Sequence, residues 1–298
     1  MRRFKLALAL ILAFSFLPVL ALAQDPVNFS VSTDWLADNL KNPNVVIVDI
    51  RKVEEYKAGH VPGAVNVFYG SWAVSKGGLQ NELPSTDDLF ETIGSAGITP
   101  GSTVIVVGKV DTMPDRVNAT RVEWTLKYAG IGNAAVLDGG FNKWVKEKKP
   151  VTTTAARPKA QSYTGKVNPD MVATKSYVMS NLGKVILVDV REPAFYTGEK
   201  KLDFVAKPGH IKGAVNLPTL QVFNADGTFK SKQELANMAV PVVGDQTSKE
   251  IITYCDTGRF CSAWTVILMD LGYKKVRNYE GSMEEWSKEP NAPVVTGK

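Results

Sequence analysis

Histidine and cysteine are scarce in this chain, and their positions exclude several kinds of site. The 298 residues hold only His60, His210, Cys255 and Cys261 of these two types. A zinc centre built from Cys and His needs three or four ligands at short spacings such as C-x-x-C, which do not occur here. Two cysteines are also too few to staple a disulfide-rich scaffold. We therefore expect a protein that folds around its own apolar core, with no metal site and no cofactor.

Long apolar runs are missing as well, except close to the N-terminus. Three basic residues in the first five positions precede the apolar run Leu6–Leu20, and Ala21–Ala23 matches an A-x-A cleavage site. This pattern predicts a signal peptide over residues 1–23 and a periplasmic or secreted mature protein. An uncleaved membrane anchor is the alternative, but the run is short for the roughly 20 residues that a spanning helix needs. After cleavage we expect no contact with a membrane.

A large excess of charge is missing too. The formal net charge of +5 falls to +2 when residues 1–23 are removed, because that segment holds three basic residues and no acidic one. A nucleic-acid-binding surface needs a clustered basic face. We therefore expect no nucleic-acid partner.

Internal repetition is the clearest positive feature of the sequence. The recurring segments are Val45–Arg51 with Val185–Arg191, Gly59–Asn66 with Gly209–Asn216, and Asp138–Trp144 with Glu280–Trp286. Between the copies, a stretch rich in Thr, Ala and Pro without apolar periodicity is typical of a linker. We predict domain 1 over residues 28–149, a linker over 150–163 and domain 2 over 164–298.

Each copy alternates short apolar runs with helical windows. The runs predict strands buried on both faces at Val45–Asp49, Thr103–Val107, Ala134–Leu137, Val185–Val190, Glu250–Tyr254 and Lys275–Tyr279. Ser32, Ser85 and Ser231 are each placed to cap a helix. This alternation predicts an α/β fold of two similar domains, each a parallel sheet with helices on both faces. Such sheets bind ligands beyond the carboxyl ends of their strands.

Both histidines and two Asp-Arg pairs occupy equivalent places in the two copies. His60 and His210 each lie in the motif G-H-[V/I]-x-G-A-V-N. Because they are duplicated while other segments differ, we interpret them as structural, which leaves no histidine to act as a general base. The repeated Asp and Arg, Asp189 and Arg191 in the second copy, are interpreted in the same way. Arg191 remains a candidate ligand-binding residue because its copy holds the cysteines.

One loop has no counterpart in the other copy. The predicted strand Ile251–Tyr254 leads into Cys255-Asp256-Thr257-Gly258-Arg259-Phe260-Cys261, and the apolar stretch Ala263–Leu271 then predicts a helix. Backbone N–H groups of such a loop and the start of a helix stabilise an anion, so they favour a thiolate at Cys255 without help from histidine. A buried, inert cysteine is the simpler alternative.

Taken together, these motifs resemble the rhodanese family, and in particular the tandem-domain sulfurtransferases that use thiosulfate or 3-mercaptopyruvate. The resemblance covers the whole mature chain and rests on V-D-x-R, G-H-[I/V]-x-G-A-V-N, Y-C-x-T-G-x and L-G-Y…V-R-N-Y-E-G-S-M-E-E-W in the family's order. It implies that domain 1 is catalytically silent. Gly108 stands where Cys255 stands in domain 2, and the segment from Gly108 to Asn118 is about five residues longer than its partner.

The resemblance also implies a reaction at Cys255. Its thiolate would take the outer sulfur of an anionic donor such as thiosulfate, and the resulting persulfide would pass that sulfur to a thiol, a protein acceptor or cyanide. The residues implied in substrate binding are Asp256, Thr257, Gly258, Arg259, Phe260, Cys261 and Arg191. Among them Arg259 is the best candidate for the anionic donor, because a guanidinium can meet sulfonate oxygens with two hydrogen bonds. A solvent-facing charge is its alternative role.

Two positions depart from the pattern of the thiosulfate enzymes. Asp256 follows the cysteine where relatives often have a basic residue, and it would repel both the thiolate and an anionic donor. Phe195 stands four residues after Arg191, where some relatives have a second arginine. Sulfur transfer is therefore a firmer expectation than thiosulfate itself.

Two other functions compete with this interpretation. A phosphatase or arsenate reductase of similar fold needs C-x5-R, and here the sixth residue after Cys255 is Cys261. A periplasmic carrier or binding module would hold a persulfide on Cys255 for a protein partner with little turnover. Turnover of p-nitrophenyl phosphate would identify a phosphatase, and stoichiometric persulfide loading with negligible multiple turnover would favour the carrier.

Cys261 itself has two possible roles. Packing as a small side chain at the start of the helix is the simpler one. The second is a reversible disulfide, formed when Cys261 attacks a persulfide or sulfenic acid at Cys255. This requires Cα atoms within about 7 Å, and a loop curled around Cys255 would oppose it if Cys261 faced the core.

Overall fold

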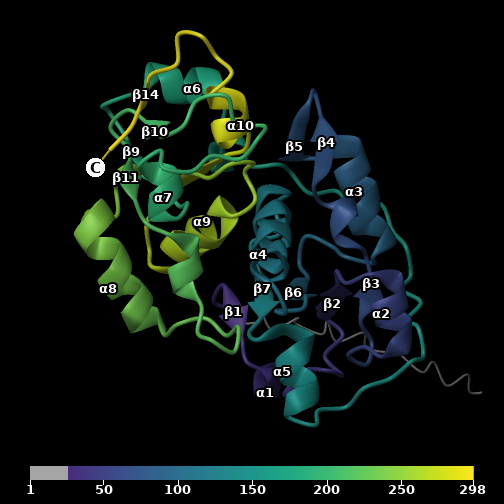
Figure 1. Ribbon diagram of the computed structural model, residues 1–298. Coiled ribbons are helices and arrows are strands. Elements are labelled where there is room, and N and C mark those ends of the chain that lie inside the picture. Colours follow the sequence, from purple (N-terminus) through teal and green to yellow (C-terminus); the bar gives the residue numbers. More distant parts are fainter. Residues whose placement is uncertain (1–25, 298) are drawn as a thin grey trace, which may run out of the picture.

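The computed structural model describes residues 26–297 (Figure 1). The predicted signal peptide lies outside the described residues. Two α/β halves lie side by side, with helices α4 and α9 meeting between them. Within residues 26–297, no helix has the length and apolar character that crossing a membrane would require.

Domain 1 is built on a five-stranded sheet in the order β1-β7-β6-β2-β3, in which every pairing is parallel. Its strands and helices are β1 Ser30–Val31, α1 Thr33–Asp38, β2 Val45–Asp49, α2 Val53–Ala58, β3 Val65–Asn66, α3 Thr86–Ser95, β6 Thr103–Val107, α4 Met113–Tyr128, β7 Ala134–Leu137 and α5 Gly140–Lys146. A hairpin of β4 Val74–Lys76 and β5 Leu79–Glu82 and the 3₁₀ turn η1 Tyr69–Ser71 complete it.

Domain 2 repeats this arrangement with a parallel sheet in the order β11-β9-β12-β13-β8. Its elements are η2 Pro169–Met171, β8 Val172–Ala173, α6 Lys175–Ser180, β9 Ile186–Asp189, α7 Pro193–Tyr196, β10 His210–Ile211, β11 Val215–Asn216, η3 Thr219–Val222, α8 Lys232–Val243, β12 Glu250–Tyr254, α9 Cys261–Asp270, β13 Lys275–Tyr279, α10 Ser282–Trp286 and β14 Val294–Val295. The two-domain α/β architecture predicted from the sequence is confirmed.

Helices cover both faces of each sheet, because successive strand residues point to opposite sides. In β2 of domain 1, Ile47 packs with residues of α1, α2 and α5, while Val48 packs with residues of α3 and α4. Domain 2 divides in the same way, with α6, α7 and α10 on one face and α8 and α9 on the other.

The predicted helix starts are confirmed by their caps. The hydroxyl groups of Ser32, Ser85 and Ser231 accept hydrogen bonds from the first turns of α1, α3 and α8, and Ser231 forms a capping box with Glu234. The predicted helix 263–271 begins two residues earlier, at Cys261. The second cysteine is therefore the first residue of α9 rather than part of the loop.

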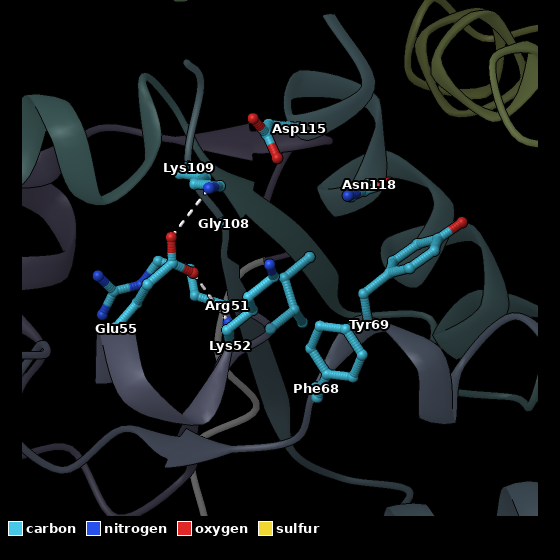
Figure 2. A pocket seen from close by; sticks show the side chains of 10 residues that line it. Arg51, Lys52, Glu55, Phe68, Tyr69, Gly108, Lys109, Asp115 and Asn118 are labelled. Carbon is cyan, nitrogen blue, oxygen red and sulfur yellow. Dashed lines mark hydrogen bonds and ion pairs between the residues drawn. The ribbon is translucent and has the colours of Figure 1, made fainter. Parts of the chain in front are cut away.

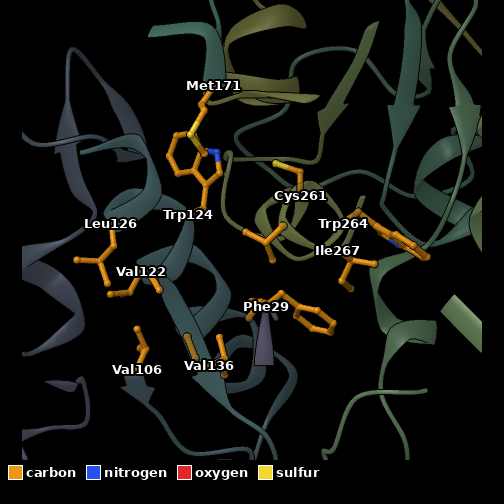
Figure 3. Close-up of a cluster of buried hydrophobic side chains, with 14 of the residues drawn as sticks. Phe29, Val106, Val122, Trp124, Leu126, Val136, Met171, Cys261, Trp264 and Ile267 are labelled. Carbon is orange, nitrogen blue, oxygen red and sulfur yellow. The ribbon is translucent and has the colours of Figure 1, made fainter. Parts of the chain in front are cut away.

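The two domains share one apolar core. Figure 3 shows Val122 and Trp124 of α4 on one side of it and Trp264 and Ile267 of α9 on the other, with Phe29 beneath them. All five side chains are buried. Such a continuous core holds α4 and α9 in a fixed relation, so residues of domain 1 can take part in the site of domain 2.

Candidate functional site

Cys255 lies where β12 ends, at the carboxyl edge of the domain 2 sheet. Its side chain is only 2% exposed, yet it contributes to the wall of a pocket of about 380 Å³. The pocket is lined by Met113, Val190, Arg191, Glu192, Phe195, Leu202, Thr219, Leu220, Cys255, Asp256 and Phe260. Met113 begins α4, so domain 1 closes part of this pocket.

The surroundings of Cys255 stabilise its thiolate. Burial alone would raise the pKa of this thiol, but the Cys261 thiol and the backbone N–H groups of Thr257, Cys261 and Phe260 outweigh burial and lower it to about 6. The loop therefore surrounds the sulfur with donors, as the sequence predicted. At neutral pH the sulfur is mainly the nucleophilic thiolate.

Ser282 fixes the geometry of the loop from outside it. Its hydroxyl accepts hydrogen bonds from the backbone N–H groups of Cys255 and Gly258, both at 3.1 Å, and donates one to the Tyr279 carbonyl at 2.7 Å. Ser282 has a φ of 45°, in the left-handed region, and its domain 1 counterpart is Gly140 with a φ of 58°. A side chain is kept in this strained conformation because its hydroxyl joins both ends of the loop.

Two residues of domain 1 also hold the loop. Arg121 of α4, fully buried, donates to the Gly258 carbonyl at 3.0 Å and to the Glu280 carboxylate at 2.5 Å. Asn81 of β5 donates to the Thr257 hydroxyl at 3.0 Å. Arg121, Asn81 and Ser282 were not predicted from the sequence, because each acts on residues far away in the chain.

Arg191 has a structural role in addition to lining the pocket. It makes hydrogen bonds to both oxygens of Asp189 and donates to the Gly209 carbonyl at 2.7 Å. Arg51 repeats these contacts with Asp49 and the Gly59 carbonyl. The prediction that these pairs tie loops together is confirmed.

The histidines are structural too. His60 stacks on Tyr56 and His210 on Tyr196, each with ring centroids 3.7 Å apart. The Nδ1 atom of each histidine makes a hydrogen bond to the backbone carbonyl of the tyrosine on which it stacks. Neither histidine contributes to the wall of the pocket that holds Cys255.

Asp256 faces Arg191 across 3.3 Å at the edge of the same pocket. Burial raises the pKa of this carboxyl to about 7, with the Cys255 thiolate and Asp189 adding to the rise and Arg191 opposing it. Near neutral pH a large fraction of Asp256 is therefore uncharged. The repulsion expected from its position next to the cysteine is reduced accordingly.

The residues predicted to bind substrate divide into two groups. Arg191, Asp256 and Phe260 line the pocket together with Cys255, whereas Thr257, Gly258, Arg259 and Cys261 do not. The Arg259 guanidinium lies over the Phe260 ring at 5.4 Å. It also lies beside Tyr69 of domain 1, where burial raises the pKa of the tyrosine hydroxyl and Arg121 and Arg259 counter part of the rise. A direct contact with a donor would require Arg259 to turn from this position.

Cys261 faces both the core and the other cysteine. It is fully buried, and its sulfur lies 3.5 Å from the Cys255 sulfur and 3.0 Å from the Asn278 side-chain oxygen. Burial and the neighbouring Cys255 sulfur raise the pKa of the Cys261 thiol. The two cysteines are unbonded in this structure.

Domain 1 has an equivalent pocket without a sulfur. Figure 2 shows this hollow of about 260 Å³, where Gly108 takes the place of the cysteine and the Lys109 ammonium lies 2.8 Å from a Glu55 oxygen. The extra residues between Gly108 and Asn118 do not lengthen the loop that follows the strand. Most of them extend helix α4, which begins at Met113 under a Thr112 cap.

Comparison with known proteins agrees with this two-domain arrangement. The model of the rhodanese-like domain matches residues 32–147 and again residues 173–289. The chain belongs to the rhodanese family. It is a tandem-domain rhodanese and a sulfurtransferase.

Full-length relatives of this rhodanese have closely related names. A protein of Synechococcus elongatus provisionally named thiosulfate sulfurtransferase is 33% identical over 290 residues, which cover 94% of this chain and 88% of that protein. A protein of the same provisional name from Mycolicibacterium smegmatis is 32% identical over 277 residues, with 90% and 97% coverage. The sulfur carrier protein TtuD of Thermus thermophilus is 31% identical over 286 residues, with 90% and 96% coverage.

Solved structures show the same fold. The anaerobic ergothioneine biosynthesis enzyme of Chlorobium limicola, in complex with trimethyl histidine, superposes on this rhodanese with a TM-score of 0.77 at 21% identity. The match covers 91% of this chain and 71% of that one. At this identity the likeness extends to the fold alone.

Proposed function

We propose that this sulfurtransferase carries a sulfane sulfur on Cys255, from an anionic donor such as thiosulfate to a thiol or cyanide acceptor. One observation supports this proposal: the Cys255 thiol has a lowered pKa of about 6, and its side chain also lies in the wall of an open pocket. A nucleophile is ionised there without a histidine, and small molecules can reach it.

In the first half-reaction the Cys255 thiolate attacks the outer sulfur of the donor. For thiosulfate, the new S–S bond forms as the old one breaks, and sulfite leaves with the electron pair. The persulfide keeps the negative charge on its outer sulfur. The N–H groups of Thr257, Phe260 and Cys261 already point at the Cys255 sulfur, so they stabilise charge in this region during the transfer.

In the second half-reaction an acceptor thiolate or cyanide attacks the outer sulfur, and the Cys255 thiolate is the leaving group. A thiolate of lowered pKa leaves readily. The apolar side chains of Phe195, Leu202 and Leu220 in the pocket wall would contact carbon atoms of an acceptor thiol. Cyanide needs no such contact and serves as an assay acceptor.

The silent role of domain 1 is part of the same proposal. Gly108 offers no nucleophile at the equivalent strand end, and the ammonium group of Lys109 and the carboxylate of Glu55 pair with each other beside it. Domain 1 instead supplies Met113 to the pocket of domain 2, and Arg121 and Asn81 to the loop.

Steady-state kinetics test this proposal. Initial rates measured over a grid of thiosulfate and cyanide concentrations should give parallel double-reciprocal lines, because the two substrates react in separate steps. Intersecting lines would contradict a persulfide intermediate that outlives sulfite release.

A persulfide carrier is the second candidate function, favoured by the relative named as a sulfur carrier protein. A carrier would release one equivalent of sulfite per protein and then stop when offered only small acceptors. Continuous turnover with cyanide or a small thiol would exclude this role.

Export is a separate proposal that rests on residues 1–23 alone. Expression in a Gram-negative host followed by N-terminal sequencing of the periplasmic fraction tests it. The expected mature protein begins at Gln24, and an intact N-terminus in the membrane fraction would support an uncleaved anchor instead.

A further inference from the structure

The two sulfur atoms are placed for a reaction with each other. The Cys255 and Cys261 sulfurs are 3.5 Å apart, a separation typical of reacting atoms before a bond forms. Both side chains are buried, at 2% and 0% exposure. They are the only cysteines of the chain, so no other protein thiol competes with Cys261 within the molecule.

The direction from which Cys261 approaches Cys255 also favours a reaction between them. Cys255 lines the pocket and Cys261 does not, so Cys261 reaches the sulfur of Cys255 from the side of the core. Asn278 packs against Cys261 there, with its side-chain oxygen 3.0 Å from the Cys261 sulfur and its side-chain nitrogen donating to the Gly258 carbonyl at 3.0 Å. A donor reaches the Cys255 sulfur from the pocket, whereas Cys261 contacts that sulfur without lining the pocket. That arrangement suits displacement of the outer sulfur by attack on the inner one.

We propose a further activity, in which Cys261 attacks the inner sulfur of the Cys255 persulfide and releases hydrosulfide into the pocket. This step rests on the persulfide of the proposed function. The Cys255–Cys261 bond forms as the bond to the outer sulfur breaks. The Cys261 thiol and the persulfide anion become one disulfide and one hydrosulfide ion, so the proton of the thiol leaves with the sulfide.

Electrons balance within the protein. The sulfane sulfur gains two electrons and becomes sulfide, and the two cysteine sulfurs lose two as they join. The disulfide stops further loading until an external dithiol reduces it through thiol–disulfide exchange. With a dithiol present, the protein is thus a sulfide-releasing enzyme, and without one it performs a single conversion.

The conversion should be slow, because the Cys261 sulfur attacks only after its proton has passed to the outer sulfur of the persulfide anion. Burial and the Cys255 sulfur raise the pKa of the Cys261 thiol, so this proton transfer is unfavourable. Transfer to abundant cyanide therefore competes well with sulfide release near pH 7. Sulfide release becomes visible when no acceptor is present.

The experiment uses the protein loaded with thiosulfate under anaerobic conditions without thiols. Sulfite is measured during loading, and the desalted protein is then followed by sulfide release and by intact mass. The proposal predicts that the native protein, one sulfur heavier at the start, becomes two hydrogen atoms lighter than the reduced protein. One sulfide should appear for each sulfite.

Cys261→Ser and Cys261→Ala are the matched variants. Both should release sulfite on loading, although more slowly because the Cys261 thiol helps to lower the pKa of Cys255, and both should keep the added sulfur. A native protein that releases sulfite but keeps its persulfide would overturn this inference alone. Equal sulfide release from the variants, or a sulfur mapped to Cys261, would overturn it too. No sulfite from the native protein would instead overturn the proposed function.

Discussion

The strands β6 and β12 end at equivalent points of the two sheets, but the chain continues differently after each. After β12, the five residues Asp256–Phe260 curl around Cys255 before α9 begins at Cys261, and the N–H groups of Thr257, Phe260 and Cys261 point at the Cys255 sulfur. After β6, the chain passes Gly108 and enters the longer helix α4 at Met113. One repeat therefore forms an anion site, while the other has a longer segment that forms a longer helix, which packs against the partner domain.

A second difference follows from the first. Gly140 and Ser282 occupy the same left-handed position at the start of α5 and α10. A Cβ at Gly140 would lie 2.6 Å from the Gly108 carbonyl oxygen, so glycine fits there. In domain 2 the strained serine is kept because its hydroxyl binds the N–H groups of Cys255 and Gly258. Under the proposed function, sulfur transfer therefore needs both the loop and the serine that supports it.

Among the substitutions considered, Cys255→Ser should cause the largest loss of activity. Because a serine hydroxyl remains protonated where the thiol ionises, thiosulfate:cyanide sulfurtransfer should fall by at least about a thousandfold. Thermal unfolding should change little, since the two side chains have nearly the same shape. The reciprocal variant Gly108→Cys should give no activity in the Cys255→Ser background. Activity retained in Cys255→Ser would show that Cys255 is not the nucleophile.

Arg121→Ala tests the support that domain 1 gives to the loop. The variant leaves Glu280 buried without its partner and removes one of the two side-chain hydrogen bonds to the Gly258 carbonyl, leaving the one from Asn278. We expect the free energy of unfolding to fall by about 3–5 kcal/mol and kcat/KM to fall more than about tenfold.

Arg116→Ala is the matched control for Arg121→Ala. Arg116 also lies on α4 and contacts domain 2, at the exposed Asn224 and Ala225 carbonyls far along the chain from the loop. Its removal should leave kcat within about twofold, as is usual for exposed contacts. Equal losses in the two variants would show that α4 acts only as a general interdomain support.

Much of the fold could be predicted because its signals are local. A run of apolar residues bounded by polar ones indicates a strand, and a serine directly before a helical window indicates the start of a helix. Both signals can be recognised from residues that are close together in the sequence. Five of the six predicted strands have the bounds expected, and Val185–Val190 loses one residue at each end. The sequence shows that the segment Gly108–Asn118 is longer than its partner, but no local signal showed that most of the extra residues belong to helix α4.

The support of the site had no such local signal. Arg121 and Gly258 are 137 positions apart in the chain, and Asn81 and Thr257 are 176 apart. The one available hint was a serine at position 282 where the other copy has Gly140. The approach of Cys261 to Cys255 depends on how tightly the loop curls, which composition alone does not determine.

The rate of reaction with thiosulfate should depend on pH, because two groups in the domain 2 pocket titrate near neutral pH. Cys255 becomes a thiolate above its lowered pKa of about 6, and Asp256 becomes a carboxylate above its raised pKa of about 7. For thiosulfate, kcat/KM should therefore rise as Cys255 ionises and fall severalfold as Asp256 gains charge. Asp256→Asn should remove the alkaline fall.

A neutral alkylating reagent provides the control for this profile. Iodoacetamide should react with Cys255 faster as the pH rises through about 6, with no decline afterwards. A decline with the neutral reagent would mean that Asp256 acts on the thiolate and not on the donor.

Arg259→Ala is expected to have the smallest effect. A lost charge-assisted bond to the donor would cost about 1.5–3 kcal/mol in kcat/KM. Because Arg259 lies over Phe260 and outside the pocket wall, we expect a change below about threefold, as for a distant partly screened charge. A loss of tenfold or more would show that its side chain turns into the pocket when the donor binds.

Mass spectrometry after brief thiosulfate treatment tests the central claim most directly. At acidic quench, before sulfide is released, the native protein should carry the mass of one added sulfur, and peptide mapping should place it on Cys255. Cys255→Ser should carry none. An unmodified native protein, or a sulfur found elsewhere in the chain, would contradict the account.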